Sequence, residues 1–267
     1  MEYLCQHCNN DINANFCSNC GQKRYKRIDK KYVLDEIQYV LIHTNKGFLY
    51  SAKNIIKSPG RTANNFITGD RVNHYKPLLL VFLLSSLATF LGYKVLNMGQ
   101  VMTESFATQQ NLNSAFMNDV MTLLSSYTAF FYLLLIPLFA LCTKLAFSNW
   151  GQNYYEHIIM NSYIVSFYML FSIIIVYPIL YFFKTDTETF LQISMVSTVS
   201  IPLIIIWFFK HFYPNKSLST IIWRSLFSII LVVVAYFILI MIAMVGGFIY
   251  GAIKGPEALE YMKPQKL

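Results

Sequence analysis

Charged side chains are scarce in this sequence, and their scarcity excludes a large class of proteins. Asp, Glu, Lys and Arg make up 13% of the 267 residues, against roughly 25% in an ordinary soluble domain. So few charges cannot cover a water-soluble globule of this size, whereas a surface that faces lipid needs no polar coat. Hydrophobic residues reach 55%, and the mean hydropathy is +0.44. The composition therefore indicates an integral membrane protein.

Cysteine is almost confined to one short stretch. Four of the five cysteines form the pattern Cys5-x-x-Cys8, eight further residues, and Cys17-x-x-Cys20. Two thiolates three positions apart on a tight turn can share one ion, and two such turns complete the tetrahedral shell that zinc prefers. The pattern predicts a four-cysteine zinc ribbon, with two disulfides as the alternative. Four protein ligands leave no open position for substrate, so the zinc is expected to be structural.

Lysine and arginine are absent from residues 97–122, which contain Glu104 and Asp119. Residues 1–76, by contrast, contain twelve basic and six acidic residues. Because short basic loops stay on the cytoplasmic side of a membrane, we expect a cytoplasmic N-terminus and place residues 97–122 on the opposite side. The loop after the fourth apolar run is expected in the cytoplasm as well, because it is flanked by Lys210, Lys216 and Arg224.

Five long apolar runs follow, and each reaches the roughly 17–25 residues that cross the hydrocarbon core of a bilayer. They cover residues 77–96, 123–147, 158–183, 190–209 and 221–250. Pro137, Pro178 and Pro202 are expected to kink three of the runs, and Gly246-Gly247 to break the fifth. The expected fold class is an all-α integral membrane helical bundle of about five transmembrane helices.

Shorter amphipathic patterns lie between the cysteines and the first apolar run. Apolar residues at helical spacing predict short helices over residues 32–43, from about Gly47 to just before Pro59, and over residues 62–68. In the second of these helices, Ile55 and Ile56 are expected on one apolar face. Such helices are too short to cross a bilayer and would lie on its surface or pack on the bundle. The expected organisation is a zinc-ribbon module (1–22), a basic linker with amphipathic juxtamembrane helices (23–76), the transmembrane bundle (77–253) and a short polar tail (254–267).

Basic and aromatic residues mark the entry to the first apolar run. Arg61, Arg71, Tyr75 and Lys76 gather there, and arginine is well shaped to bind phosphate. One interpretation is a clamp for an anionic lipid headgroup. The other is an interfacial anchor for the first span.

Familiar catalytic motifs are absent. The sequence contains no Gly-x-Ser-x-Gly, no His-Glu-x-x-His and no phosphate-binding loop. Glu156 and His157 are neighbours that would point about 100° apart on a helix, so a polar helix cap is favoured over an acid–base pair. Cys142 lies in an apolar run, where a thiol packs and has little thiolate. The span centres contain almost no ionisable residue, which argues against an ion-coupled carrier.

The N-terminal motifs resemble those of a known family. Phe16-Cys-Ser-x-Cys-Gly-Gln-Lys23 is similar to the zinc-ribbon opening of many bacterial membrane proteins. Together with Gly47-Phe-Leu, Pro59-Gly60, Gly69-x-Arg71 and Tyr75-x-Pro77, it resembles the bacterial family catalogued as domain of unknown function 3667. The resemblance covers about the first 80 residues. It implies this architecture and a bacterial inner membrane, and it implies no mechanism.

Three functions are consistent with these patterns. The first is a non-enzymatic membrane protein that binds a cytoplasmic protein partner or anionic lipid through its zinc ribbon and basic segment, while the bundle serves for anchoring or assembly. The second is a transporter or translocator of a lipid or small molecule, and the third is an intramembrane lipid-modifying enzyme. Because the basic residues directly precede membrane helices, anionic lipid is favoured over nucleic acid as their partner, and a plain topology signal is favoured over both. The oligomeric state stays open.

Overall fold

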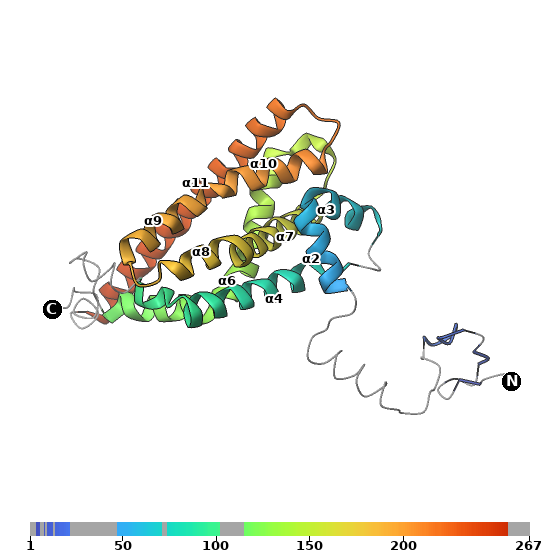
Figure 1. Ribbon diagram of the computed structural model, residues 1–267, viewed down its shortest axis with the longest axis horizontal. Coiled ribbons are helices and arrows are strands. Elements are labelled where there is room, and N and C mark those ends of the chain that lie inside the picture. Colours follow the sequence, from blue (N-terminus) through green and yellow to red (C-terminus); the bar gives the residue numbers. More distant parts are fainter. Residues whose placement is uncertain are drawn as a thin grey trace. The chain divides into compact units, whose positions relative to one another are not determined.

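The structure, a computed structural model, describes residues 4, 5, 8, 10–12, 14–21, 47–70, 74–101 and 115–255. The chain divides into two units, residues 1–45 and 46–267, and each is described by itself. The helix predicted over 32–43, the linker over 23–31 and the tail from residue 256 onward lie outside the described residues. Helices dominate the second unit, and the part of the chain that the structure describes contains no strand (Figure 1).

Five described helical segments are long and apolar enough to cross a membrane, which confirms the predicted number. The second and the fifth span each lie within one helix, whereas each of the other three combines two or more helical segments. The first span consists of α4 (Pro77–Phe90) and the π-helix η1 (Leu91–Val95), and the second lies in α6 (Ala115–Ala146). The third consists of α7 (Tyr154–Phe171), the π-helix η3 (Ser172–Val176) and α8 (Tyr177–Phe182). The fourth consists of α9 (Thr187–Thr198) and α10 (Ser200–Phe212), and the fifth lies in α11 (Leu218–Lys254). The fold is therefore an all-α, multi-pass membrane bundle.

Irregular turns in the third and fourth spans lie next to proline, as predicted. Pro178 follows η3 at the second residue of α8. Proline has no N–H to offer the carbonyl four residues earlier, and the wider π turn accommodates the missing bond. Pro202 cannot bond to the carbonyl of Thr198, the residue at which α9 ends. In the second span the helix is continuous at Pro137, and the non-helical residue is Tyr127 (φ −116°, ψ 18°). The kink expected at Pro137 therefore lies earlier in the helix.

The break expected at Gly246-Gly247 is wrong, because α11 continues through both glycines to Lys254. A break inside lipid would leave backbone N–H and C=O groups unpaired, at a cost of several kcal/mol each. A glycine in a helix interior costs only about 1 kcal/mol relative to alanine. The helix is therefore the less costly arrangement for this segment.

The third span forms the centre of the bundle. Its helix α7 packs against α4, α6 and α10 (Figure 1), and half of its most apolar window is buried. The fifth span is peripheral, since 6% of its apolar window is buried and large side chains such as Trp223, Phe237 and Phe248 are exposed. Lipid can cover such an apolar surface where water would not.

Two short helices precede the first span, as predicted. They are α2 (Gly47–Lys57) and α3 (Pro59–Thr68), and α3 begins three residues earlier than expected because proline suits the first position of a helix. Both helices pack on the bundle against α7, and α3 also packs against α10. Ile55 is fully buried, whereas Ile56, expected on the same face, is 47% exposed.

Gly60 allows α3 to lie directly on α10. A Cβ atom at Gly60 would be 2.0 Å from the carbonyl oxygen of Phe208 and 2.8 Å from the amide nitrogen of Phe212. Both neighbours are backbone atoms of α10, so neither can rotate away as a side chain can. The absence of a side chain at Gly60 therefore sets how closely α3 approaches the fourth span.

We expect Gly60→Ala to push α3 away from α10 and to lower the free energy of unfolding by about 3 kcal/mol, a large value for an overpacked core. Gly246→Ala is the matched control, because Gly246 is also helical and no atom lies within 4 Å of its added Cβ. Thermal unfolding in detergent measures both variants. Equal unfolding temperatures for the two variants would contradict the close approach of α3 to α10.

Candidate functional site

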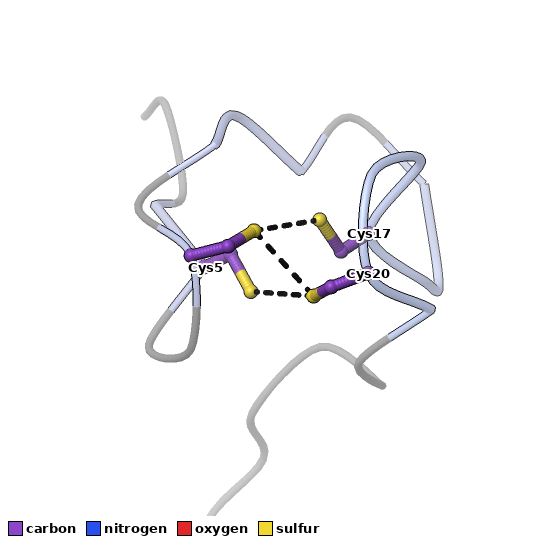
Figure 2. A group of neighbouring side chains, drawn as sticks. Cys5, Cys17 and Cys20 are labelled. Atoms are coloured by element: carbon purple, nitrogen blue, oxygen red, sulfur yellow. Dashed lines mark hydrogen bonds between the residues drawn. The ribbon is translucent and has the colours of Figure 1, made fainter.

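The four N-terminal cysteines come together in space. Their sulfur atoms all lie within 4.8 Å of one another, and Figure 2 shows the side chains of Cys5, Cys17 and Cys20 facing one another. The sulfur–sulfur distances are 3.5 Å for Cys5 and Cys20, 3.6 Å for Cys8 and Cys17, and 3.4 Å for Cys8 and Cys20. None of the four is part of a disulfide, so the structure contains neither of the two alternative disulfides, and the fifth cysteine, Cys142, is buried in α6.

Short turns hold the two pairs of cysteines in position. An antiparallel bridge joins Leu4 and Asp11 across the first pair. After the second pair, Gly21 adopts a φ of +74°, and its N–H donates to the carbonyl oxygen of Cys17 at 3.0 Å. Glycine adopts a positive φ without steric cost, so it suits the position that ends this turn.

The surroundings of Cys17 favour its thiolate. Backbone N–H groups of Cys20 and Asn19 donate to its sulfur and lower the pKa of the thiol to about 6, so the thiolate predominates at neutral pH. Among the described residues, Ile12 is the only member of the buried cluster that is not a cysteine. So small a core cannot hold a fold by itself, and a bound ion would supply the missing cross-links.

Four thiolates in this arrangement could hold one metal ion. A tetrahedral ion with metal–sulfur bonds of about 2.3 Å requires sulfur atoms about 3.8 Å apart, close to the distances observed. Four cysteine sulfurs complete such a shell and leave no position for a substrate. The four sulfurs could therefore hold one ion in a closed shell.

A basic cleft forms where α3 meets the end of α10. It has a volume of about 300 Å³ and is lined by Arg61, Asn64, Lys210, His211 and Pro214. The Lys210 amine donates to the carbonyl oxygens of Pro214 and Lys216 at 3.1 and 3.0 Å, which hold it at the end of α10. The His211 ring donates through Nδ1 to the Trp207 carbonyl oxygen at 2.9 Å, because a carbonyl can only accept.

One of the residues that the sequence predicted for a headgroup clamp lines this cleft. Arg61 lines the basic cleft. Tyr75 is buried, and Lys76 is exposed immediately before α4; neither lines the cleft. Arg71 lies outside the described residues.

Lys210 and His211 are cleft residues that sequence reasoning missed. They stand far from Arg61 along the chain, and in the sequence Lys210 indicates only topology. The packing of α3 on α10 through Gly60 brings them together. A local pattern contains no signal for such a contact.

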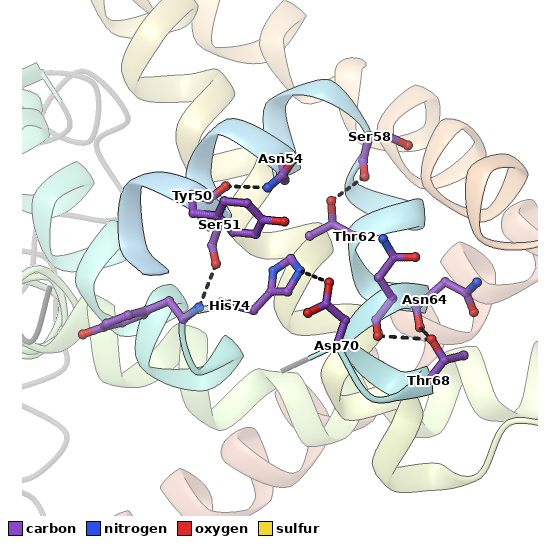
Figure 3. A network of polar contacts seen from close by, with 11 residues as sticks. Tyr50, Ser51, Asn54, Ser58, Thr62, Asn64, Thr68, Asp70 and His74 are labelled. Atoms are coloured by element: carbon purple, nitrogen blue, oxygen red, sulfur yellow. Dashed lines mark hydrogen bonds and ion pairs between the residues drawn. The ribbon is translucent and has the colours of Figure 1, made fainter. Parts of the chain in front are cut away.

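A polar network ties the segment before α4 back to α2 (Figure 3). The backbone N–H of Tyr75 donates to the hydroxyl of Ser51 at 2.7 Å, and Ser51 is fully buried. Nε2 of His74 lies 3.9 Å from Oδ2 of Asp70, and burial lowers the pKa of His74 although the carboxylate opposes that shift. These contacts position the entry to the first span, which is what an interfacial anchor requires.

The polar pair at the start of the third span separates as the helix geometry predicted. The Glu156 carboxylate accepts from the backbone N–H of Asn153 at 2.7 Å, and the Asn153 side chain accepts from the N–H of Glu156, which forms a capping box. His157 is fully buried instead, and its Nδ1 lies 3.1 Å from Oγ1 of Thr143. Glu156 is therefore a helix cap, and the buried contact of His157 is a feature that the sequence did not indicate.

Comparison with known proteins identifies no relative. Neither a family model, nor a curated protein, nor a solved structure matches the chain. The geometry of the cysteine cluster and of the bundle therefore carries the functional argument.

A bound ion should protect the four N-terminal thiols from alkylation, because a coordinated thiolate is not free to react. We expect iodoacetamide to leave them unmodified in the purified protein and to modify all four once a strong chelator is added. The mass of the N-terminal peptide measures both states. Cys20 is exposed, so its rapid modification without chelator would argue against the metal centre.

Proposed function

We propose that this chain is a non-enzymatic protein of a bacterial inner membrane, in which a cytoplasmic zinc ribbon binds a protein partner and the helical bundle serves for anchoring or assembly. The convergence of four cysteines in a unit with almost no other core carries this proposal. A module held together by an ion has its outer surface available for binding. Leu4 and Phe16 are 55% and 58% exposed and offer apolar contacts to a partner.

Zinc is the ion that the donor set favours. Four thiolates in a tetrahedral arrangement are typical of zinc or of iron–sulfur centres. Zinc has no redox chemistry and suits a closed structural site. Cysteines on the cytoplasmic side stay reduced and are therefore available as ligands.

Basic residues at one end of the bundle support a cytoplasmic N-terminus. Lys144 and Arg224 donate to backbone carbonyls at and just beyond the end of α6. Arg61 and Lys210 share the basic cleft. Because basic residues near span ends favour the cytoplasmic face, we assign this end, together with the chain that enters the first span, to the cytoplasm.

The resemblance of the N-terminal motifs to domain of unknown function 3667 supports a bacterial inner membrane. The motifs that carry it include the cysteines and the Pro59-Gly60 pair. The structure gives the second of these motifs a physical role, since Pro59 starts α3 and Gly60 seats it on α10.

An anionic lipid headgroup is the proposed ligand of the basic cleft. Arg61 presents a planar set of hydrogen-bond donors that matches phosphate oxygens. Lys210 and His211, at the end of a membrane span, offer the same phosphate further hydrogen-bond donors or positive charge. A cleft at the end of a membrane span would meet lipid phosphates at the membrane surface.

Removal of the metal ligands should release the protein partner. Affinity purification from native membranes is expected to recover one zinc ion per chain and a specific protein, and the quadruple cysteine-to-serine variant should lose both. Cys142→Ser is the control and should retain both, because Cys142 lies in a membrane span. Equal recovery of the partner with the quadruple variant, or no specific partner with the intact chain, would refute the docking role. An iron–sulfur absorption spectrum would refute the assignment of zinc.

Loss of charge from the basic cleft should weaken the retention of phosphatidylglycerol. Native mass spectrometry of the protein from mixed phosphatidylglycerol and phosphatidylcholine nanodiscs should show about fivefold less bound phosphatidylglycerol per charge removed in Arg61→Gln/Lys210→Gln. The control Lys53→Gln/Lys57→Gln removes the same number of charges from exposed residues outside the cleft. Equal losses in the two variants would mean that net charge, and not the cleft, attracts the lipid.

A further inference from the structure

A cavity lies inside the bundle between α6, α7, α10 and α11. Its volume is about 330 Å³, within the range of small-molecule sites in proteins. Most of its walls are apolar and include Phe139, Ile164, Val165, Ile204 and Val232. Side chains from four membrane spans thus line a space that suits hydrocarbon.

Two polar side chains of this cavity, Thr143 and Asn161, lie toward the basic end of the bundle. Thr143 lies three residues before the end of α6, and Asn161 lies seven residues after the start of α7. Tyr132 lines the cavity eleven residues earlier in α6, which places it about 16 Å deeper at about 1.5 Å per residue. The cavity is therefore long relative to its volume, as a single lipid chain requires, with Thr143 and Asn161 near one end and Tyr132 and Tyr168 deeper among apolar side chains.

Hydrogen bonds within the protein already use the donors at the polar end. The Thr143 hydroxyl donates to the carbonyl oxygen of Phe139 at 3.0 Å. The Asn161 amide nitrogen donates to Oγ1 of Thr143 and to the carbonyl oxygen of His157, both at 2.8 Å. The atom that faces a carbonyl must be the nitrogen, so the orientation of the Asn161 amide follows from this network. Ser228, which also lines the cavity, donates to the Ser225 carbonyl oxygen at 2.7 Å.

Around Thr143, Asn161 and Ser228 the groups left for a ligand are therefore acceptors, whereas the hydroxyls of Tyr132 and Tyr168 belong to the deeper part of the cavity. The side-chain oxygen of Asn161 and the lone pairs of the Ser228 oxygen can each accept a hydrogen bond. A hydroxyl on the ligand satisfies such a site, whereas an ester or ether oxygen meets no available donor there. Unsatisfied acceptors buried among apolar walls cost free energy, so this difference produces a preference.

The head of the ligand should also be neutral. No charged side chain lines the cavity, and an ionised group at this depth would be costly without a partner. A carboxylate or phosphate is therefore disfavoured inside the cavity, in contrast to the basic cleft.

We propose that this cavity binds the hydrocarbon chain of a neutral lipid alcohol, whose hydroxyl donates to the side-chain oxygen of Asn161 or to Ser228. The shared chemistry is a hydroxyl at the head of one chain. A fatty alcohol, a monoacylglycerol and an isoprenoid alcohol all have it. The proposal does not depend on the zinc ribbon or on the basic cleft.

Competition binding with radiolabelled dodecanol tests the proposal on the full-length protein, purified in a steroid detergent that has no alkyl chain to compete. We expect one saturable site per chain. Farnesol and monolaurin should compete, and whichever competes better identifies the isoprenoid or glyceride source. Methyl laurate should compete about tenfold less well than dodecanol, in line with the loss of one hydrogen bond, and laurate should not compete. No saturable binding, or equal competition by methyl laurate, would overturn the proposal.

Matched substitutions locate the site. Ile204→Trp places bulk in the cavity and should abolish binding, whereas Leu203→Trp adds the same bulk at a 64% exposed position on the same helix and should preserve it. Val165→Phe is a second cavity variant in case Ile204→Trp does not fold, as judged by size-exclusion chromatography. Ser228→Ala should reduce the ratio of the affinity for dodecanol to the affinity for methyl laurate.

Equal dodecanol binding by the cavity variants and Leu203→Trp would place the ligand elsewhere and overturn the proposal. The quadruple cysteine-to-serine variant should bind dodecanol as the intact chain does. Failure of the zinc-ribbon proposal and failure of this one are therefore distinguishable.

Discussion

Water is absent from the hydrocarbon core of a bilayer, so each polar group of this chain that enters it needs a partner within the protein. Helices meet this requirement for the backbone, because each amide bonds to the carbonyl four residues earlier. Several hydroxyl side chains follow the same pattern: Thr89, Thr143, Ser162 and Ser194 each donate to the carbonyl four residues before them. A hydroxyl bonded in this way presents little polarity to its neighbours, so serine and threonine in a span do not by themselves indicate a functional site.

The same constraint applies to buried polar atoms that have no hydrogen-bond partner. Nε2 of His157 and the hydroxyls of Tyr163 and Ser166 are buried on α7 without a hydrogen-bond partner among the described residues. Such groups are costly in an apolar interior. They belong to the helix that also supplies Asn161 to the intramembrane cavity. These three residues do not line the cavity, so their unpartnered atoms are a feature of the packed centre of the bundle and not of the proposed ligand site.

The two units depend on different sources of stability. The bundle buries a large apolar core around α7, with fully buried side chains such as Tyr163, Phe208 and Ile136. The N-terminal unit has Ile12 and its cysteines, too little apolar surface to offset the entropy of ordering the chain. Metal coordination is the interaction that can make up the difference, which is why the sulfur cluster and the fold of this unit belong together.

Local properties explain what the sequence predicted correctly. Span number, the helices α2 and α3, and the cysteine cluster each depend on residues within one helix or one pair of turns. The failure at Gly246-Gly247 has the opposite origin, because pressure to keep the backbone bonded inside lipid outweighs the local preference of glycine. The irregular residue of the second span, Tyr127, lies ten residues before Pro137, where the sequence contains no local signal for a kink. The cleft of Arg61 and Lys210, and the cavity that Thr143 and Asn161 share, involve residues on different helices, so no local pattern indicates them.

By itself, the sequence determined which stretches enter a membrane and which side chains can bind a metal ion, because hydropathy and cysteine spacing act over short distances along the chain. Only the tertiary structure decided which helix faces meet. That choice depends on the fit between distant surfaces, as at Gly60 and Phe208, where the absence of one Cβ atom allows two helices to touch.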